Sequence, residues 1–305
     1  MDSKRILIVC SINWGKVAPF VLDQAESLKV QGIEIDFYTI SQKGLWGYLK
    51  SRKGLLQKIK EFTPDIVHAH YGLSGLFANL QRRVPVVTTY HGSDINYRKM
   101  FRFSRMAIVL SKFNIFVSQK NIEKVKPEQN YALIPCGVDT ELFKPLNKAE
   151  CRAKLGFTND EKIVLFSASF DNKIKNPVLA KNAIELLPDV RLIELKGYSR
   201  QQVSLLMNAV DAVLMTSFTE GSPQFIKEAM ACNCPVVSVD VGDVKDVISG
   251  VENCFITPYD HKIIAECLHN VISSGKRTMG RDKISHFDNQ LIAEEIVKVY
   301  NKVLL

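Results

Sequence analysis

The chain has 305 residues, of which 46% are hydrophobic and 24% charged, and its formal net charge is +8. This composition is typical of a soluble globular protein and argues against a disordered chain. The length exceeds the roughly 100 to 200 residues usual for one domain, so we expect two domains, each with its own core.

The cysteines and the apolar runs bear on the compartment. Seven cysteines stand singly apart from Cys232-x-Cys234, and no CxxC pair occurs. This pattern indicates a reducing compartment and argues against a disulfide scaffold or a zinc site. Residues 6–12 form only a brief apolar run without a clear cleavage site, and no run approaches the roughly 18 to 20 apolar residues that span a bilayer. We therefore expect a cytoplasmic protein.

The positive charge belongs to the first half of the chain. Residues 1–146 contain 21 lysines and arginines against 12 acidic residues, whereas residues 147–305 contain 19 against 20. Residues 43–60 mix basic and apolar side chains in a pattern suited to an anionic membrane surface. A second basic cluster lies among aromatic residues and consists of Arg98, Lys99, Arg102 and Arg105. Solvated helix faces are the equal alternative for both stretches, and nucleic-acid binding is less favoured because no such motif accompanies the charge.

Apolar runs alternate with helical patterns from end to end, which predicts α/β domains with doubly wound parallel sheets. In the first half, the expected strands lie near residues 5–10, 33–39, 65–69, 85–90, 113–118 and 131–134. The loop after the first strand contains one glycine, Gly15, and no GxGxxG, so the dinucleotide fingerprint is absent. A tight turn that needs glycine is sufficient to explain Gly15.

Three histidines follow strands of the first half. His68 and His70 alternate along the end of the third strand and should point to one face. The HxH spacing could indicate a metal, but no further ligand has convincing spacing, so we favour a packed or hydrogen-bonding role. His91 ends the fourth strand, at the sheet edge where α/β proteins bind ligands. Asp94 could orient a ligand or a loop, and a local turn cap is the equal alternative.

Residues 135–145 contain glycine and proline and predict the crossing from a first domain, residues 1–144, to a second, residues 145–286. The strands of the second domain are expected near residues 162–168, 190–195, 211–216, 235–239 and 253–256. Apolar residues at helical spacing predict a final helix within residues 287–305, which we expect to pack back on the first domain.

The most informative stretch is SFTEGSPQFIKEAMACN, residues 217–233. A helix should open at Ser222, because serine is a good N-cap and proline suits the first helical position. Free amides at Ser222, Gln224 and Phe225 would then favour a phosphate. Glu220 and Glu228 bracket this position at about 9 to 12 Å along the axis, given ~1.5 Å per residue. A nucleotide sugar has that layout: a ribose, a diphosphate and a sugar.

This Glu-x7-Glu block resembles the donor-site signature of the retaining glycosyltransferases of family 4, and is most similar to their TuaC-like polysaccharide-biosynthesis branch. Further stretches follow the order of the family: KRILIV at 4–9, PDIVHAH at 64–70, TYHGSD at 89–94 and IPCGVDTELFKP at 134–145. The resemblance covers essentially the whole chain. It implies the GT-B fold, in which two Rossmann-like domains face a cleft.

The resemblance also implies roles for particular residues. Glu220 would hold sugar hydroxyls near the reacting carbon, Glu228 would bind the ribose hydroxyls, and His91 would face the donor sugar. Lys175 matches a lysine that grips the diphosphate. Family members usually carry an arginine as well, but Ser169 stands in its place, and Lys173 is our candidate to replace the lost charge. The other expected donor contacts are Gly15, Tyr198, Gly221, Ser222, Pro223, Gln224 and Phe225.

The expected reaction moves a sugar, with retention, from a nucleoside diphosphate sugar to a hydroxyl of a lipid-linked or oligosaccharide acceptor. UDP-sugars are favoured and GDP-mannose is next. No acidic pair of the DxD type is convincing, so we expect no metal and no other cofactor.

Hydrolysis by a carboxylate pair is disfavoured, because Glu220 and Glu228 should lie near or beyond the upper limit of about 9.5 Å for such pairs. A non-catalytic subunit that binds nucleotide sugar stays as the alternative. The expected partners are the donor, the acceptor and an anionic membrane surface at the inner face of the cell membrane, without nucleic acid.

Overall fold

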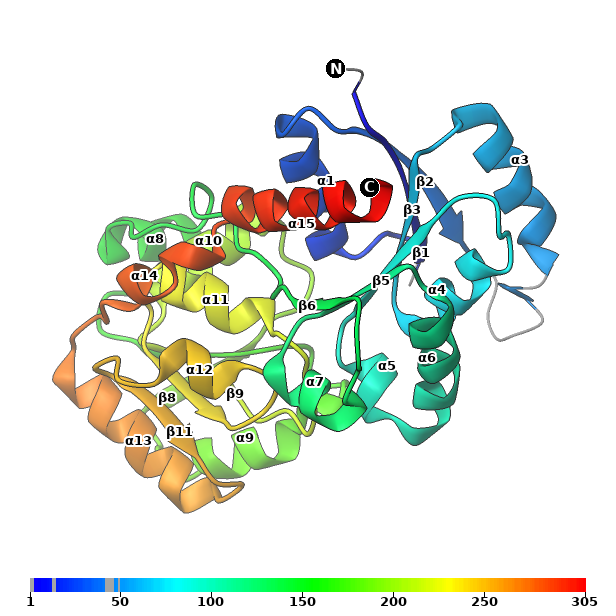
Figure 1. Cartoon of the computed structure of the whole chain (residues 1–305). Helices are drawn as coiled ribbons and strands as arrows, with labels where there is room; N and C mark the ends of the chain where they lie inside the picture. Colours follow the sequence, from blue (N-terminus) through cyan, green and yellow to red (C-terminus); the bar gives the residue numbers. More distant parts are fainter. Residues whose placement is uncertain (1–2, 13–14, 42–46, 49) are drawn as a thin grey trace. The chain divides into compact units, whose positions relative to one another are not determined.

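The computed structural model describes residues 3–12, 15–41, 47–48 and 50–305 (Figure 1). The chain divides into two compact units, one of Met1–Gly137 with Asn289–Leu305 and one of Val138–Asp288. The division falls at Gly137, earlier than the predicted boundary at residue 144, and the final helix groups with the first unit. None of the described helices combines the length and the apolar character that crossing a membrane requires.

The first unit contains a six-stranded parallel sheet in the order β2-β1-β3-β4-β5-β6. Its strands are β1 Arg5–Ser11, β2 Glu34–Ile40, β3 Ile66–His70, β4 Val86–Tyr90, β5 Phe113–Phe116 and β6 Tyr131–Leu133. Its described helices are α1 Pro19–Val30, α3 Arg52–Phe62, α4 Gly72–Asn79, α5 Ser93–Asn96, α6 Arg98–Leu110, α7 Gln119–Val125 and α15 Asn289–Leu304.

Both faces of this sheet are covered, which explains its continuous apolar strands. Successive side chains of a strand point to opposite faces, so neighbouring residues of β1 enter different cores. Ile6 packs with Ile296 and Tyr300 of α15, whereas Leu7 packs with Leu55 and other residues of α3. Figure 1 shows α15 running beside α1, the helix with which it is in contact.

The second unit contains a five-stranded parallel sheet in the order β11-β10-β9-β7-β8. Its strands are β7 Lys162–Phe166, β8 Val190–Glu194, β9 Ala212–Met215, β10 Val236–Val239 and β11 Cys254–Thr257. Its helices are α8 Lys148–Leu155, η1 Lys173–Lys175, α9 Pro177–Ile184, α10 Arg200–Ala209, α11 Gln224–Ala231, α12 Val244–Ile248, α13 His261–Ser274, α14 Gly280–Lys283 and η2 Ser285–Phe287. The predicted parallel α/β sheets are confirmed in both units.

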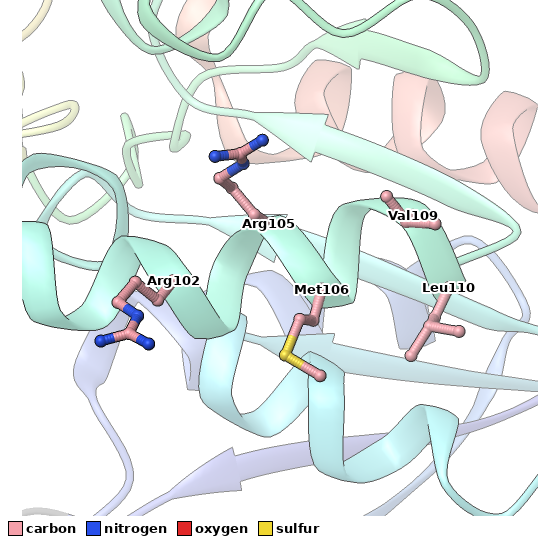
Figure 2. Close-up of a pocket in the computed structure, with 5 residues that line it drawn as sticks. All are labelled: Arg102, Arg105, Met106, Val109 and Leu110. Carbon is pink, nitrogen blue, oxygen red and sulfur yellow. The ribbon is translucent and has the colours of Figure 1, made fainter.

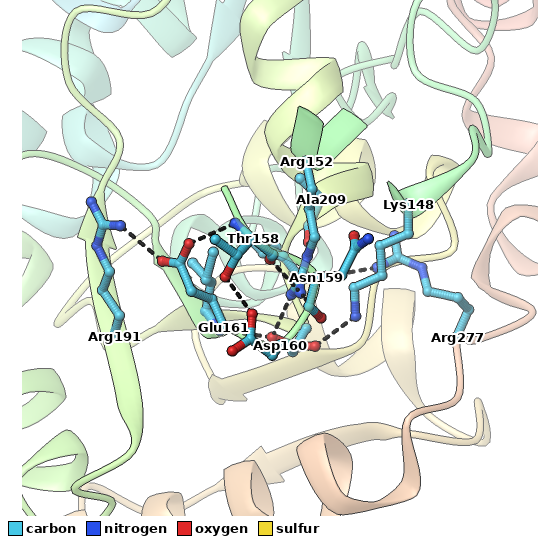
Figure 3. Close-up of polar contacts among 12 residues, drawn as sticks. Lys148, Arg152, Thr158, Asn159, Asp160, Glu161, Arg191, Ala209 and Arg277 are labelled. Atoms are coloured by element: carbon cyan, nitrogen blue, oxygen red, sulfur yellow. Dashed lines mark hydrogen bonds and ion pairs between the residues drawn. The ribbon is translucent and has the colours of Figure 1, made fainter. Parts of the chain in front are cut away.

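A buried arginine joins the elements at the amino ends of two strands of the second unit (Figure 3). Arg152, on α8, is 2% exposed, and its guanidinium donates to the carbonyls of Asn159 and Ala209 at 2.7 and 2.8 Å. It also forms an ion pair of 3.0 Å with Asp211, whose carboxylate accepts the Ile163 amide at 2.6 Å. The start of β7, the start of β9 and α8 are thereby held together. The loops that carry the predicted site leave the opposite, carboxyl ends of these strands.

Candidate active site

The helix after β9 begins later than the sequence pattern predicts. α11 starts at Gln224, with Pro223 as its N-cap residue and no side-chain cap, so the expectation of a Ser222 cap and Pro223 as the first helical residue is wrong. The reason is that the Ser222 hydroxyl is engaged elsewhere, donating to Asp243 Oδ2 at 2.5 Å. The first amides of α11, at Gln224 and Phe225, keep the orientation that favours an anion, because the first amides of a helix lack intrahelical acceptors.

A buried lysine fixes the loop before α11. Lys227 is 0% exposed, and its ammonium lies 3.2 Å from Asp243 Oδ2, contacts the Ser222 hydroxyl and lies 4.5 Å from the centre of the Phe287 ring. Asp243 is also buried, and its amide donates to the Gly221 carbonyl at 3.2 Å. Asp243 is also the N-cap residue of α12, but its side chain makes no capping hydrogen bond to that helix. The Asp243 carboxylate therefore stabilises the loop of Gly221 and Ser222.

Gly242 is required where it stands. Its φ is +58°, a conformation that L side chains rarely adopt, and a Cβ there would lie 2.4 Å from the Gly221 carbonyl oxygen. Any larger residue would separate the two loops. The backbone at Gly221 is therefore held by close packing as well as by the buried charges.

Two of the predicted catalytic residues meet in the second unit. Glu220 Oε1 lies 2.5 Å from Lys175 Nζ, and both side chains are largely but not fully buried. Backbone contacts hold the two loops together, because the Phe218 amide donates to the Ile174 carbonyl at 2.9 Å and the Thr216 hydroxyl donates to the Lys175 carbonyl at 2.9 Å. The pair places one positive and one negative charge immediately before the loop of Gly221 and Ser222.

The neighbouring basic candidate differs from Lys175. Lys173 belongs to the same 3-10 turn but is exposed, and no contact of its side chain is identified among the described residues. Ser169, at the position of the missing arginine, donates to Asp171 at 3.2 Å, and Asp171 also pairs with Lys196 at 2.7 Å. Replacement of the lost arginine by Lys173 thus stays a prediction.

The second acidic residue also has a basic partner, and the sequence reading missed it. Glu228 is 4% exposed and forms an ion pair with Arg200, the first residue of α10. The Arg200 guanidinium lies 4.8 Å from the centre of the Phe143 ring. Ser199 and Gln202 form a capping box that fixes this helix start. From the sequence, Arg200 is only a basic residue at the start of a helix after β8, and this position alone does not predict a contact with Glu228.

The remaining predicted contacts of the second unit are placed as follows. Tyr198 is 38% exposed, in the loop before α10. Phe225 is buried, and Gln224 has a buried side-chain oxygen without a hydrogen-bond partner among the described residues. An unsatisfied buried oxygen beside two helix-start amides that lack intrahelical acceptors is where a ligand could bind.

The first unit holds its three histidines in one stack. The rings of His68 and His70 are 4.7 Å apart between centres, and those of His70 and His91 are 5.2 Å apart, both nearly parallel. His68 bonds through its two nitrogens to the hydroxyls of Tyr300 and Thr89 at 2.6 and 2.7 Å. No group of three or more metal-ligating side chains is found within the described part of the chain. The hydrogen-bonding role predicted for His68 is thus observed.

His91 is engaged inside the first unit. Its Nε2 lies 2.9 Å from His70 Nδ1, and its Nδ1 lies 3.8 Å from Cys136 Sγ. The His91 and Gly72 amides donate to the two carboxylate oxygens of Asp94 at 3.0 and 2.9 Å. Asp94 therefore acts as a buried turn cap, the alternative left open for it, and burial raises its pKa to about 6. The sugar-facing role of His91 stays a prediction.

Gly15 belongs to the first unit and has a φ of +76°, with open space where a Cβ would stand. The turn alone accounts for glycine here. Its predicted approach to the donor phosphate stays a prediction.

Acidification is expected to destabilise the first unit. Burial holds the pKa values of His68 and His91 well below 6.5 and lowers that of His70 from 6.5 to about 3. The unfolded chain therefore binds these protons first, so stability present above pH 6.5 is lost as the pH falls toward 3. At pH 4.5, His70 alone accounts for a loss of about 2.7 kcal/mol of stability, and the raised pKa of Asp94 offsets about 2 kcal/mol of the total loss.

Urea unfolding followed by tryptophan fluorescence measures this effect, because both tryptophans, Trp14 and Trp46, belong to the sequence of the first unit. The midpoint should fall between pH 7 and 4.5, and His70→Gln should make the fall shallower. A midpoint that is the same at both pH values would contradict the buried, neutral stack.

Comparison with known proteins finds sequence matches over most of the chain. Residues 17–142 match the family described as Glycosyltransferase Family 4, and residues 162–274 match the glycosyl transferases group 1. The chain is 25% identical, over 242 residues, to a Bacillus subtilis protein described as the teichuronic acid biosynthesis glycosyltransferase TuaC, covering 69% of this chain and 62% of that protein. It is 25% identical, over 268 residues, to a D-inositol 3-phosphate glycosyltransferase of Mycobacterium marinum, covering 71% and 57%. The chain thus spans about three-fifths of the length of these curated relatives.

Solved structures show the same fold. Sucrose-phosphate synthase from Thermosynechococcus elongatus superposes with a TM-score of 0.86 at 16% identity, covering 98% of this chain and 99% of that chain. Anabaena HepE in complex with UDP superposes with a TM-score of 0.76 at 18% identity, covering 98% and 100%. The chain therefore has the GT-B fold, with a first part that matches the family 4 glycosyltransferases and a second part that matches the glycosyl transferases group 1.

Proposed function

We propose that the chain is a retaining glycosyltransferase that moves a sugar from a nucleoside diphosphate sugar to a hydroxyl of a lipid-linked or oligosaccharide acceptor in cell-surface polysaccharide assembly. The observation that carries the proposal is the pair of Glu220 and Lys175 beside the packed loop of Gly221 and Ser222. A UDP-sugar is the favoured donor, supported by the HepE structures that contain UDP and UDP-glucose.

The costly event in such a transfer is departure of the diphosphate. The bond between the anomeric carbon and the phosphate oxygen breaks, a bond to the acceptor oxygen forms on the same face, and the acceptor proton passes to the leaving diphosphate. Fixed positive charge and preorganised amides lower this barrier, because they bind the charge as it develops. Lys175 and the first amides of α11 supply both in our proposal, without a metal.

The two acidic residues would bind hydroxyls. Glu220 would orient the sugar by accepting hydrogen bonds from its hydroxyls, and Lys175 lies 2.5 Å from the carboxylate that does so. Glu228 would accept from the ribose, oriented by Arg200. A carboxylate held by a guanidinium presents its free lone pairs in a fixed direction, which suits a ribose diol. His91 would assist at the sugar, as the resemblance implies.

Nucleotide binding and turnover together test the function. In a thermal-shift panel, UDP at 100 times its dissociation constant should stabilise the protein by about 2.7 kcal/mol, and GDP or ADP at the same concentration should stabilise it less. Radiolabelled UDP-glucose incubated with lipid-linked acceptor should then release UDP and label the acceptor.

A non-catalytic subunit gives a different result. It would retain the labelled donor and shift the melting temperature without releasing nucleotide. If neither UDP, GDP nor ADP stabilises the protein, the proposed donor class is wrong.

A further inference from the structure

The outer face of α6 is basic at one end and apolar at the other. Buried Ser104 and Ala107 mark the inner side of the helix, which packs against α4 and α5. The exposed side chains of α6 are Arg98, Lys99, Arg102, Arg105, Met106, Val109 and Leu110. We call these seven residues the α6 face. Figure 2 shows five of them projecting from the helix.

The charge of the α6 face has no local balance. No aspartate or glutamate occurs between Asp94 and Glu123, a stretch that contains the four basic residues of the face. No ion pair joins any of these four residues to an acidic group among the described residues. Their guanidinium and ammonium groups are thus available to an external anion.

Its apolar end is unusually exposed. Val109 is 82% exposed, Met106 54% and Leu110 44%. With Arg102 and Arg105 these residues line a shallow hollow of about 550 Å³. Large apolar side chains grouped at a surface indicate an interaction site, because water contact there is unfavourable. The aromatic residues among the basic cluster, Phe101 and Phe103, instead pack against the core of the first unit.

We propose that the α6 face docks on the surface of an anionic phospholipid membrane. Arginines at the headgroup phosphates beside apolar side chains at the acyl boundary form the pattern of an interfacial helix. A second copy of the chain is disfavoured as the occupant, because a two-fold contact would place this positive face against itself. The proposal does not depend on which nucleotide sugar the second unit binds.

The other basic stretch, residues 43–60, fits a solvated face where it is described. On α3 the apolar residues Leu55 and Ile59 are buried, and Lys58 pairs with Asp36 at 2.5 Å. Lys53 and Lys60 are exposed without exposed large apolar neighbours on that helix. Lys43 and Trp46 lie outside the described residues. α3 therefore supplies a matched control for charge alone.

Vesicle flotation with the full chain tests the proposal. The protein should float with phosphatidylcholine vesicles that contain phosphatidylglycerol, stay behind with phosphatidylcholine alone, and lose binding as salt rises. Arg102→Glu/Arg105→Glu should weaken binding at least about tenfold, since each basic residue near the surface contributes roughly fivefold. Lys53→Glu/Lys60→Glu, which changes the net charge equally, should weaken it much less.

A second variant separates docking from simple charge attraction. Met106→Ser/Val109→Ser keeps every charge and should still weaken binding to the mixed vesicles. Equal binding to neutral vesicles, an equal loss in the α3 control, or unchanged binding of the serine variant would each overturn the proposal. If the protein forms dimers that the serine variant abolishes, the α6 face binds a second copy of the chain and the membrane proposal is wrong. If the protein binds a random oligonucleotide more tightly than vesicles, the face binds nucleic acid and the proposal is equally wrong.

Discussion

Replacing Lys175 with alanine is expected to lower kcat for sugar transfer by about 10²- to 10³-fold. The ammonium would bind the diphosphate as negative charge develops on it, and removing one such preorganised group typically has this effect. The substitution also removes the ammonium that lies 2.5 Å from Glu220, so the orientation of this carboxylate should be less tightly fixed. Steady-state release of UDP from the labelled donor measures the change.

Lys173→Ala is the matched control, because Lys173 lies in the same 3-10 turn and is exposed. If Lys173 replaces the missing arginine, its loss should raise KM for the donor, with a smaller effect on kcat. If donor affinity and turnover stay unchanged, Lys173 has no such role. Turnover that survives Lys175→Ala at the wild-type rate would remove Lys175 from the proposed mechanism.

Replacing Lys227 with methionine is expected to destabilise the second unit by about 3 to 5 kcal/mol. Methionine has a similar length, but it leaves the Asp243 carboxylate buried without the ammonium now 3.2 Å away. Urea unfolding followed by circular dichroism gives the loss of free energy. Hydrogen exchange of peptides from residues 138–288 assigns it to the second unit.

The double variant Lys227→Met/Asp243→Asn separates the ion pair from simple packing. Removing both charges avoids the uncompensated buried carboxylate, so much of the lost stability should return. The amide oxygen of asparagine can still accept from Ser222. A double variant no more stable than Lys227→Met would show that the pairing of these charges is not what stabilises the loop.

The sheets could be predicted because their signal is local. Each strand is a short apolar run, and both faces of each sheet are buried, so periodicity alone located the strands of both units. The helix after β9 was misplaced for a non-local reason. The hydroxyl of Ser222 has the chemistry of a cap, but Asp243 from another loop accepts its hydrogen bond. Capping rules take no account of such a competitor.

The charged groups of the candidate site also could be predicted only where the local sequence carries a signal. Glu220 could be selected from the Glu-x7-Glu stretch, and Lys175 because it matches a lysine of the family that the chain resembles. Lys227 and Arg200 could not, because a lysine or arginine on a helix is usually solvated. Their importance comes from ion pairs with the buried carboxylates of Asp243 and Glu228, which only the folded chain reveals. On α6, spacing identified the basic side and missed the exposed Val109.

The Arg152 network has a consequence for redesign. It ties β7, β9 and α8 together at the ends of the strands remote from the loops of Lys175 and Glu220. A scaffold anchored at its base tolerates exchange of the segments at its rim. Grafting residues 169–176, which follow β7, from a related transferase should thus be feasible without rebuilding the core, which makes this half of the chain a practical host for altered binding of the donor diphosphate.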